Sequence, residues 1–196
     1  MADHHHQPHG PHNHILDHAV RESSVAIENS ESFTNKIAVL TAVISTIGAV
    51  FSYMGGATQV NSALYKNMAA IKKTEAANQW NYYQAKSNKQ SLAEYGLETL
   101  PAKREHYNQT IARYSLEKIA IKKIADQLEA ESVEWDKKSE REIHLHHRWE
   151  QATTVLQVSI ALAAITLITR RSWAMWGIYG ISTTGIILGL MAALHI

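Results

Sequence analysis

The sequence contains no cysteine and only three prolines and nine glycines. Without cysteine the chain can form no disulfide, no thiolate metal site and no cysteine nucleophile. It also lacks a glycine-rich phosphate loop and a serine in a recognisable nucleophile motif, so nothing in it predicts an enzyme or a cofactor. A formal net charge of +1 gives no electrostatic reason to expect nucleic acid as a partner.

Charged residues are missing from three apolar stretches, residues 37–54, 153–169 and 173–196. At about 1.5 Å per residue, helices of these lengths reach roughly 25 to 36 Å, against a hydrocarbon core of about 30 Å. We therefore predict three transmembrane helices surrounded by membrane lipid. Pumps and coupled transporters usually need titratable groups at membrane depth, so their absence here argues against active transport.

The charged part of the chain lies between the first two stretches. Residues 57–150 carry 15 Lys and Arg against 13 Asp and Glu. Their composition favours helix, and Gly96 and Pro101 predict a turn at residues 96–101. Apolar residues at heptad spacing on both arms predict an antiparallel, coiled-coil-like hairpin in an all-α protein. Its expected core consists of Leu64, Ile71, Tyr82, Tyr114, Ile121, Leu128 and Trp135.

Polar residues interrupt this predicted seam, which makes it weak for an isolated two-helix structure. We therefore expect further helices from other subunits, and so a homo-oligomer. The last predicted span adds a second packing feature, because Gly185, Gly189 and Ala193 recur at steps of four. Small residues at that spacing let helix backbones approach closely inside a membrane.

Seven of the twelve histidines lie before Ala19, within a polar segment, residues 1–36. Its composition predicts a disordered tail, with a short amphipathic helix over residues 15–33 as an addition. The segment lacks the basic and then apolar regions of a cleavable signal peptide. Clustered imidazoles bind Zn, Ni or Cu ions, but a solubilising tail is the preferred interpretation.

A second histidine pattern lies just before residue 153. Glu140, His144 and His147 recur at steps of four and three, which places a carboxylate and two imidazoles on one helical face. Such residues are ligands for Zn or Fe in helical bundles, although a second helix would have to contribute ligands. A hydrated girdle at the membrane interface explains the pattern better, so we assign no metal site.

The positive charges near the spans predict an orientation. Arg170 and Arg171 occupy the short loop between the second and third stretches, and Lys36 precedes the first. Short loops with Lys or Arg tend to remain in the cytoplasm. The amino terminus is thus expected in the cytoplasm and the helical hairpin in the periplasm.

Several of these segments resemble a bacterial membrane family known as domain of unknown function 4337. The resemblance rests on the His-rich start, the first span, Trp80–Lys89 (WNYYQAKSNK), the His146–His147 pair and Leu167–Arg171 (LITRR). Family members commonly read closer to WAYYQAKSIK, so Asn81 and Asn88 are departures. The resemblance implies a three-span inner-membrane protein with a helical insertion, and it supplies no activity and no site residues.

Together these patterns favour a non-enzymatic, self-associating inner-membrane protein. Its helical hairpin would serve as a scaffold or as a surface for an unidentified protein partner. Two other functions stay open. Hydroxyl-bearing residues in the spans, such as Ser45, Thr46 and Ser182, are compatible with a passive channel or oligomeric pore. The amino-terminal histidines are compatible with a metal-binding membrane protein.

Overall fold

The computed structural model describes residues 11–195, with side chains described from residue 18 onward except those of Ala26 and Asn29. It consists of three α-helices, α1 (Pro11–Thr99), α2 (Arg104–Thr169) and α3 (Ser172–Ala193), with a short 3-10 helix, η1 (Pro101–Lys103), between the first two. Within residues 11–195 there is no β-strand, so the described chain is all-helical, as predicted. Each of the three α-helices contains a stretch long and apolar enough to cross a membrane.

The first helix is longer than the sequence patterns predict. Helix α1 begins at Pro11 and so includes most of the segment expected to be a disordered tail with a short helix. Proline suits a helix start because the N–H that it lacks would have no partner there. The part of the predicted tail at residues 1–10 lies outside the described residues.

The turn between α1 and α2 also differs from the prediction, which placed it at residues 96–101. Helix α1 continues to Thr99, and the chain turns through Leu100 and η1 before α2 begins. Gly96 therefore lies inside α1, where its carbonyl accepts a hydrogen bond from the Leu100 N–H (2.9 Å). The reason for glycine here is space: a Cβ atom at Gly96 would lie 2.6 Å from Cζ of Tyr107.

The chain divides into two compact units. Among the described residues, the first unit contains those up to Ser52 and those from Glu150 onward, so it includes parts of α1 and α2 and the whole of α3. Its core contains Ile37 and Ile44 of α1, Leu156 and Ala163 of α2, and Ile178 of α3. The two residues from α1 and the two from α2 are each seven apart, which keeps them on one face of their helix. The Ser159 hydroxyl adds a polar link from α2 by donating to the Ile178 carbonyl of α3 (3.2 Å).

A tight turn joins α2 to α3. Arg170 adopts a left-handed conformation (φ 51°), and its N–H donates to the Thr166 carbonyl (2.9 Å). A left-handed residue directly after a helix is a common way to satisfy the last carbonyls, and glycine is the usual residue there. Arginine at this position therefore carries a conformational cost that glycine would not.

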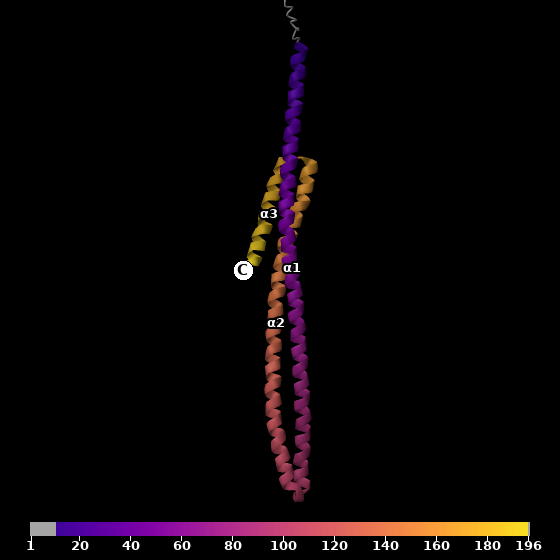
Figure 1. Ribbon diagram of the computed structural model, residues 1–196, viewed down its shortest axis with the longest axis vertical. Coiled ribbons are helices and arrows are strands. Elements are labelled where there is room, and N and C mark those ends of the chain that lie inside the picture. Colours follow the sequence, from indigo (N-terminus) through magenta and orange to yellow (C-terminus); the bar gives the residue numbers. More distant parts are fainter. Residues whose placement is uncertain (1–10, 196) are drawn as a thin grey trace, which may run out of the picture. The chain divides into compact units, whose positions relative to one another are not determined.

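The second unit, Tyr53–Trp149, consists of the remaining parts of α1 and α2 and the turn between them. We call it the helix pair. Its two helices run side by side as far as the turn (Figure 1). Successive contacts join Ser62 to Ser139 and Ala69 to Ser132, so a step of seven up α1 is a step of seven down α2. The two helices are therefore antiparallel.

Small residues line the seam of the helix pair at heptad spacing. The small buried residues at this spacing are Ser62, Ala69 and Ala76 on α1 and Ala125, Ser132 and Ser139 on α2. Small side chains let the two backbones approach closely enough for hydroxyl groups to reach carbonyls of the other helix. The Ser132 hydroxyl donates to the Ala69 carbonyl (2.9 Å). The buried Ser132 hydroxyl thus has a hydrogen-bond partner on the other helix, as buried polar groups usually do.

Candidate self-association surface

The first arm of the helix pair carries a row of large apolar side chains on its outside. We call this row the α1 stripe, and it consists of Leu64 (55% exposed), Met68 (37%), Ile71 (50%), Tyr82 (51%) and Leu92 (71%). Their successive spacings of four, three, eleven and ten residues fit two positions of the heptad, so they share one side of α1. In a single chain this side is uncovered.

This placement corrects the predicted core. Leu64, Ile71 and Tyr82 were expected between the arms, yet each is at least half exposed. The first arm has two heptad rows, and the row of small residues faces α2 because it permits the closer approach. Large residues on the same helix are left outside.

The predicted core residues of α2 lie nearer to the seam. Ile121 is 6% exposed, and Tyr114, Leu128 and Trp135 are partly buried. Trp135 packs against Tyr65 of α1, with ring centroids 5.6 Å apart. The ammonium of Lys138 lies 4.2 Å from the centroid of the Trp135 ring.

Ion pairs connect the two arms beside the seam. Lys86 contacts Glu117 at 2.6 Å, and Lys72 contacts Glu131 at 3.2 Å. The hydrogen bond between Lys86 and Glu117 raises the pKa of Lys86 above its usual value and lowers the pKa of Glu117. Both charged forms are thus favoured by folding, and the pairs help to select this partner arm.

The Trp80–Lys89 segment makes several of these contacts. The Trp80 indole N–H donates to Glu129 (3.0 Å). The Lys86 ammonium lies 5.0 Å from the Tyr82 ring centroid and 5.4 Å from that of Tyr114. Tyr82 and Tyr114 therefore approach the same lysine from opposite arms.

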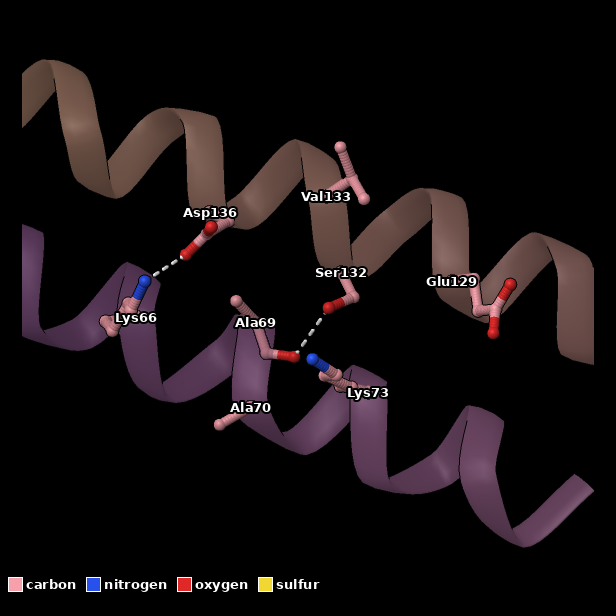
Figure 2. Close-up of a pocket in the computed structure, with 8 residues that line it drawn as sticks. All are labelled: Lys66, Ala69, Ala70, Lys73, Glu129, Ser132, Val133 and Asp136. Atoms are coloured by element: carbon pink, nitrogen blue, oxygen red, sulfur yellow. Dashed lines mark hydrogen bonds and ion pairs between the residues drawn. The ribbon is translucent and has the colours of Figure 1, made fainter.

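A groove opens on the helix pair between α1 and α2 (Figure 2). Its volume is about 440 Å³. Figure 2 shows that the lysines of its walls come from α1 and the carboxylates from α2, with the Ser132 to Ala69 hydrogen bond between them. The residues that line it are Lys66, Ala69, Ala70, Lys73, Glu129, Ser132, Val133 and Asp136.

A comparison with protein-family models identifies the family of this chain. The model described as Domain of unknown function (DUF4337) matches residues 33–195. The chain belongs to the DUF4337 family. The match includes the helix pair, the α1 stripe and the groove, so these are features of the DUF4337 part of the chain. A search of curated proteins and a search of solved structures returned no match.

In this DUF4337 chain the residues weighed as candidate metal ligands do not form a cluster within the described residues. Among the described residues no group of three or more His, Cys, Asp or Glu is close enough to hold a metal ion. Glu140, His144 and His147 are all exposed on α2. The histidines of residues 1–10 lie outside the described residues.

The neighbouring residue, His146, has a structural position that the sequence did not reveal. It is buried, and its Nδ1 lies 2.8 Å from the Gly55 carbonyl of α1. A carbonyl only accepts, so Nδ1 carries the proton and donates. Gly55 allows this approach, because a Cβ atom there would lie 3.3 Å from Cβ of Trp149.

The predicted packing residues of the last span lie in the first unit of the DUF4337 chain. A Cβ atom at Gly185 would lie 2.7 Å from Cδ2 of Leu156, and one at Gly189 would overlap the Phe51 ring. Gly185 and Gly189 are thus where α3 approaches α2 and α1. Ala193 is exposed, whereas Ala192 is buried, so the stripe of small residues shifts by one at its end.

Two of the three hydroxyl groups considered for a pore, those of Thr46 and Ser182, have partners within their own helices. Thr46 donates to the Ala42 carbonyl (2.9 Å), and Ser182 donates to the Tyr179 carbonyl (3.2 Å). Thr184 likewise donates to the Gly180 carbonyl (2.9 Å). Such bonds let a hydroxyl face an apolar environment.

Proposed function

We propose that this DUF4337 protein is a non-enzymatic membrane protein with three spans that self-associates through its helix pair. The pair then serves as a scaffold or contact surface beside the membrane. The primary partner is a second copy of the chain, and the assembled pairs present a surface to a further protein. In this proposal the amino terminus is cytoplasmic and the helix pair lies on the other side of an inner membrane.

The observation that carries the proposal is the α1 stripe. Leu64, Ile71 and Leu92 are each at least half exposed, although they repeat at heptad spacing on a helix whose inner row is Ala and Ser. Burying a large aliphatic side chain completely contributes about 1.5–3 kcal/mol. A row of such residues along one side of a helix is the pattern with which helices recognise other helices.

Charge on the groove walls supports a second copy as the partner. Lys66 pairs with Asp136, whereas Lys73 makes no ion pair within the described part of the chain. Because Ala69 pairs with Ser132, Lys73 and Glu129 lie at nearly the same level of the helix pair. Lys73 and Glu129 thus offer a second copy one positive and one negative group at the same level, and such charge complementarity favours self-recognition.

Substitution of the α1 stripe tests the proposal. The double variant Leu64→Gln/Ile71→Gln keeps helix-forming residues but removes two apolar contacts. We expect native mass spectrometry in mild detergent to find oligomers of the unaltered chain and mainly monomers of the variant. A matched control is Leu116→Gln/Ile119→Gln, which changes two exposed residues of α2 and should leave the oligomer intact.

Two results would contradict the proposal. If the unaltered chain is monomeric both in detergent and by cross-linking in membranes, self-association is wrong. If the stripe variant and the control associate as well as the unaltered chain, the α1 stripe is not the contact surface.

A further inference from the structure

One polar side chain in the predicted second span has no partner. Gln157 of α2 is exposed, and its amide makes no hydrogen bond with another group in the part of the chain that the structure describes. The hydroxyls around it are satisfied: the residues that donate to a backbone carbonyl are Thr154 (2.8 Å), Ser159 (3.2 Å), Thr166 (2.7 Å) and Thr169 (2.9 Å). Gln157 therefore differs from its polar neighbours.

The position of Gln157 makes this lack of a partner costly. It is seven residues beyond Glu150, the last charged residue before the apolar stretch, and so about 10 Å further along the helix. A primary amide has two N–H donors and a carbonyl acceptor. In hydrocarbon these groups find no water, so they gain a great deal from a protein partner.

The side of α2 that carries Gln157 permits close approach of another helix. Thr154, Ala161 and Ala164 are exposed and follow the same spacing of three and four residues. Small residues at this spacing let two helix backbones come close enough for polar side chains to meet. The α3 helix does not use this side, because it packs on Ser159 and Leu156.

We propose that Gln157 forms a hydrogen bond with Gln157 of a second copy inside the membrane. An amide is both donor and acceptor, so two copies related by a two-fold axis satisfy each other without a different partner. This inference rests on the proposed self-association and adds to it a contact between the membrane segments. The contact surface consists of Thr154, Gln157, Ala161 and Ala164.

Self-association in lipid vesicles tests the amide directly. The chain has no cysteine, so Leu100→Cys at the exposed turn gives a single labelling site for donor and acceptor dyes. In phosphatidylethanolamine and phosphatidylglycerol vesicles, we expect Gln157→Leu to weaken association roughly threefold to thirtyfold, the range of measured interhelical hydrogen bonds. Gln157→Asn keeps an amide and should retain most of the association. Circular dichroism checks that each variant remains helical.

Disulfide formation tests the geometry without changing Gln157. Ala161→Cys places a thiol on the proposed contact, and oxidation in the vesicles should link two copies. The control is Leu190→Cys, another exposed residue, on α3, which should link poorly. Equal linking at both positions would overturn the proposed contact.

The two proposals fail in different ways. If the unaltered chain transfers no energy between copies, self-association itself is wrong and the Gln157 contact is wrong with it. If the unaltered chain associates but Gln157→Leu associates equally well, the helix pair remains the contact and the Gln157 hydrogen bond is disproved.

Discussion

Ser62 and Ser139 each donate a hydroxyl hydrogen bond to the backbone carbonyl of the other, at 3.0 and 2.9 Å. The exchange is possible only where the two backbones are close, because a serine side chain is short. It fixes the register of α1 against α2 at that level. The Ser132 to Ala69 bond, one heptad nearer the turn, fixes the same register again.

The serine exchange predicts a strong size limit at residue 139. Ser139→Leu inserts a large side chain into a seam built for small ones, and we expect a loss of about 1–3 kcal/mol in the free energy of unfolding. Ser139→Ala keeps the space and removes one hydrogen bond, which costs about 1 kcal/mol. Urea unfolding in detergent, followed by circular dichroism, measures both. Ser115→Leu, on the exposed side of α2, is the control and should be nearly neutral.

Gly96 and Gly56 form a matched pair for a second prediction. Both lie inside α1, where alanine is intrinsically favoured over glycine by about 1 kcal/mol. A Cβ atom at Gly56 meets nothing within 4 Å, so Gly56→Ala should stabilise the helix. A Cβ atom at Gly96 meets the Tyr107 ring, so Gly96→Ala should gain less or lose stability.

A double variant separates the ring from the backbone in this second prediction. In a Tyr107→Ala background, Gly96→Ala should become about as stabilising as Gly56→Ala. A penalty that persists without the Tyr107 ring would show that the backbone at residue 96, not the tyrosine, requires glycine.

The Lys86–Glu117 pair predicts how stability depends on pH. The hydrogen bond from Lys86 holds the pKa of Glu117 below its usual value of 4.5. A carboxylate with a lowered pKa stabilises the fold above its unfolded-state pKa, and this stabilisation is lost as pH falls through the folded-state pKa. The thermal midpoint of the unaltered chain should therefore fall as the solution is acidified below about pH 4.5.

The substitution Glu117→Gln should remove part of that acid dependence. Because Glu117 is near the surface, salt screens the pair and the effect is smaller at high ionic strength. Glu134→Gln is the control, since Glu134 is exposed and pairs with Lys138 of its own helix at 3.7 Å, not with the other arm. An identical acid dependence in the unaltered chain and in Glu117→Gln would show that the pair does not contribute.

Membrane orientation predicts a pattern of chemical labelling. Single cysteines are informative because the chain has none of its own. A maleimide that cannot cross the inner membrane should label Leu100→Cys in cells whose outer membrane has been made permeable. Ser172→Cys, beside Arg170 and Arg171, should be labelled only after lysis. The reverse result would place the helix pair in the cytoplasm.

The sequence predicted the long helices well because breakers are so rare in it. Between Gly56 and Gly96 there is no glycine or proline, and from residue 102 to residue 169 there is none either. Such stretches leave few alternatives to helix. The turn was placed about four residues too early because Gly96 was read as a helix end. Its actual role, to leave room for Tyr107, depends on a contact between distant residues.

The inner seam of the helix pair was harder to predict than its existence. Hydrophobic periodicity selects large residues, so it identified Leu64 and Ile71 and passed over Ala69 and Ala76. A signal was nevertheless present: Ala or Ser recurs every seventh residue on both arms, at 62, 69 and 76 and at 125, 132 and 139. Searching for small residues at heptad spacing would have found the seam. The exposure of Gln157 gave no such signal, because it depends on which side of α2 meets α3.

The repeated hydroxyl-to-carbonyl hydrogen bonds fix the length of the helix pair as well as its register. Sliding one arm along the other by less than a full heptad would leave Ser132 and Ser139 facing side chains in place of carbonyls. Several hydrogen bonds along the pair therefore oppose movement of one helix along the axis of the other. The distance from Tyr53 to the tip is consequently set by residue count, about 70 Å for this arm. Insertions or deletions that keep this register must therefore come as one heptad in each arm, and each changes the length of the helix pair by about 10 Å.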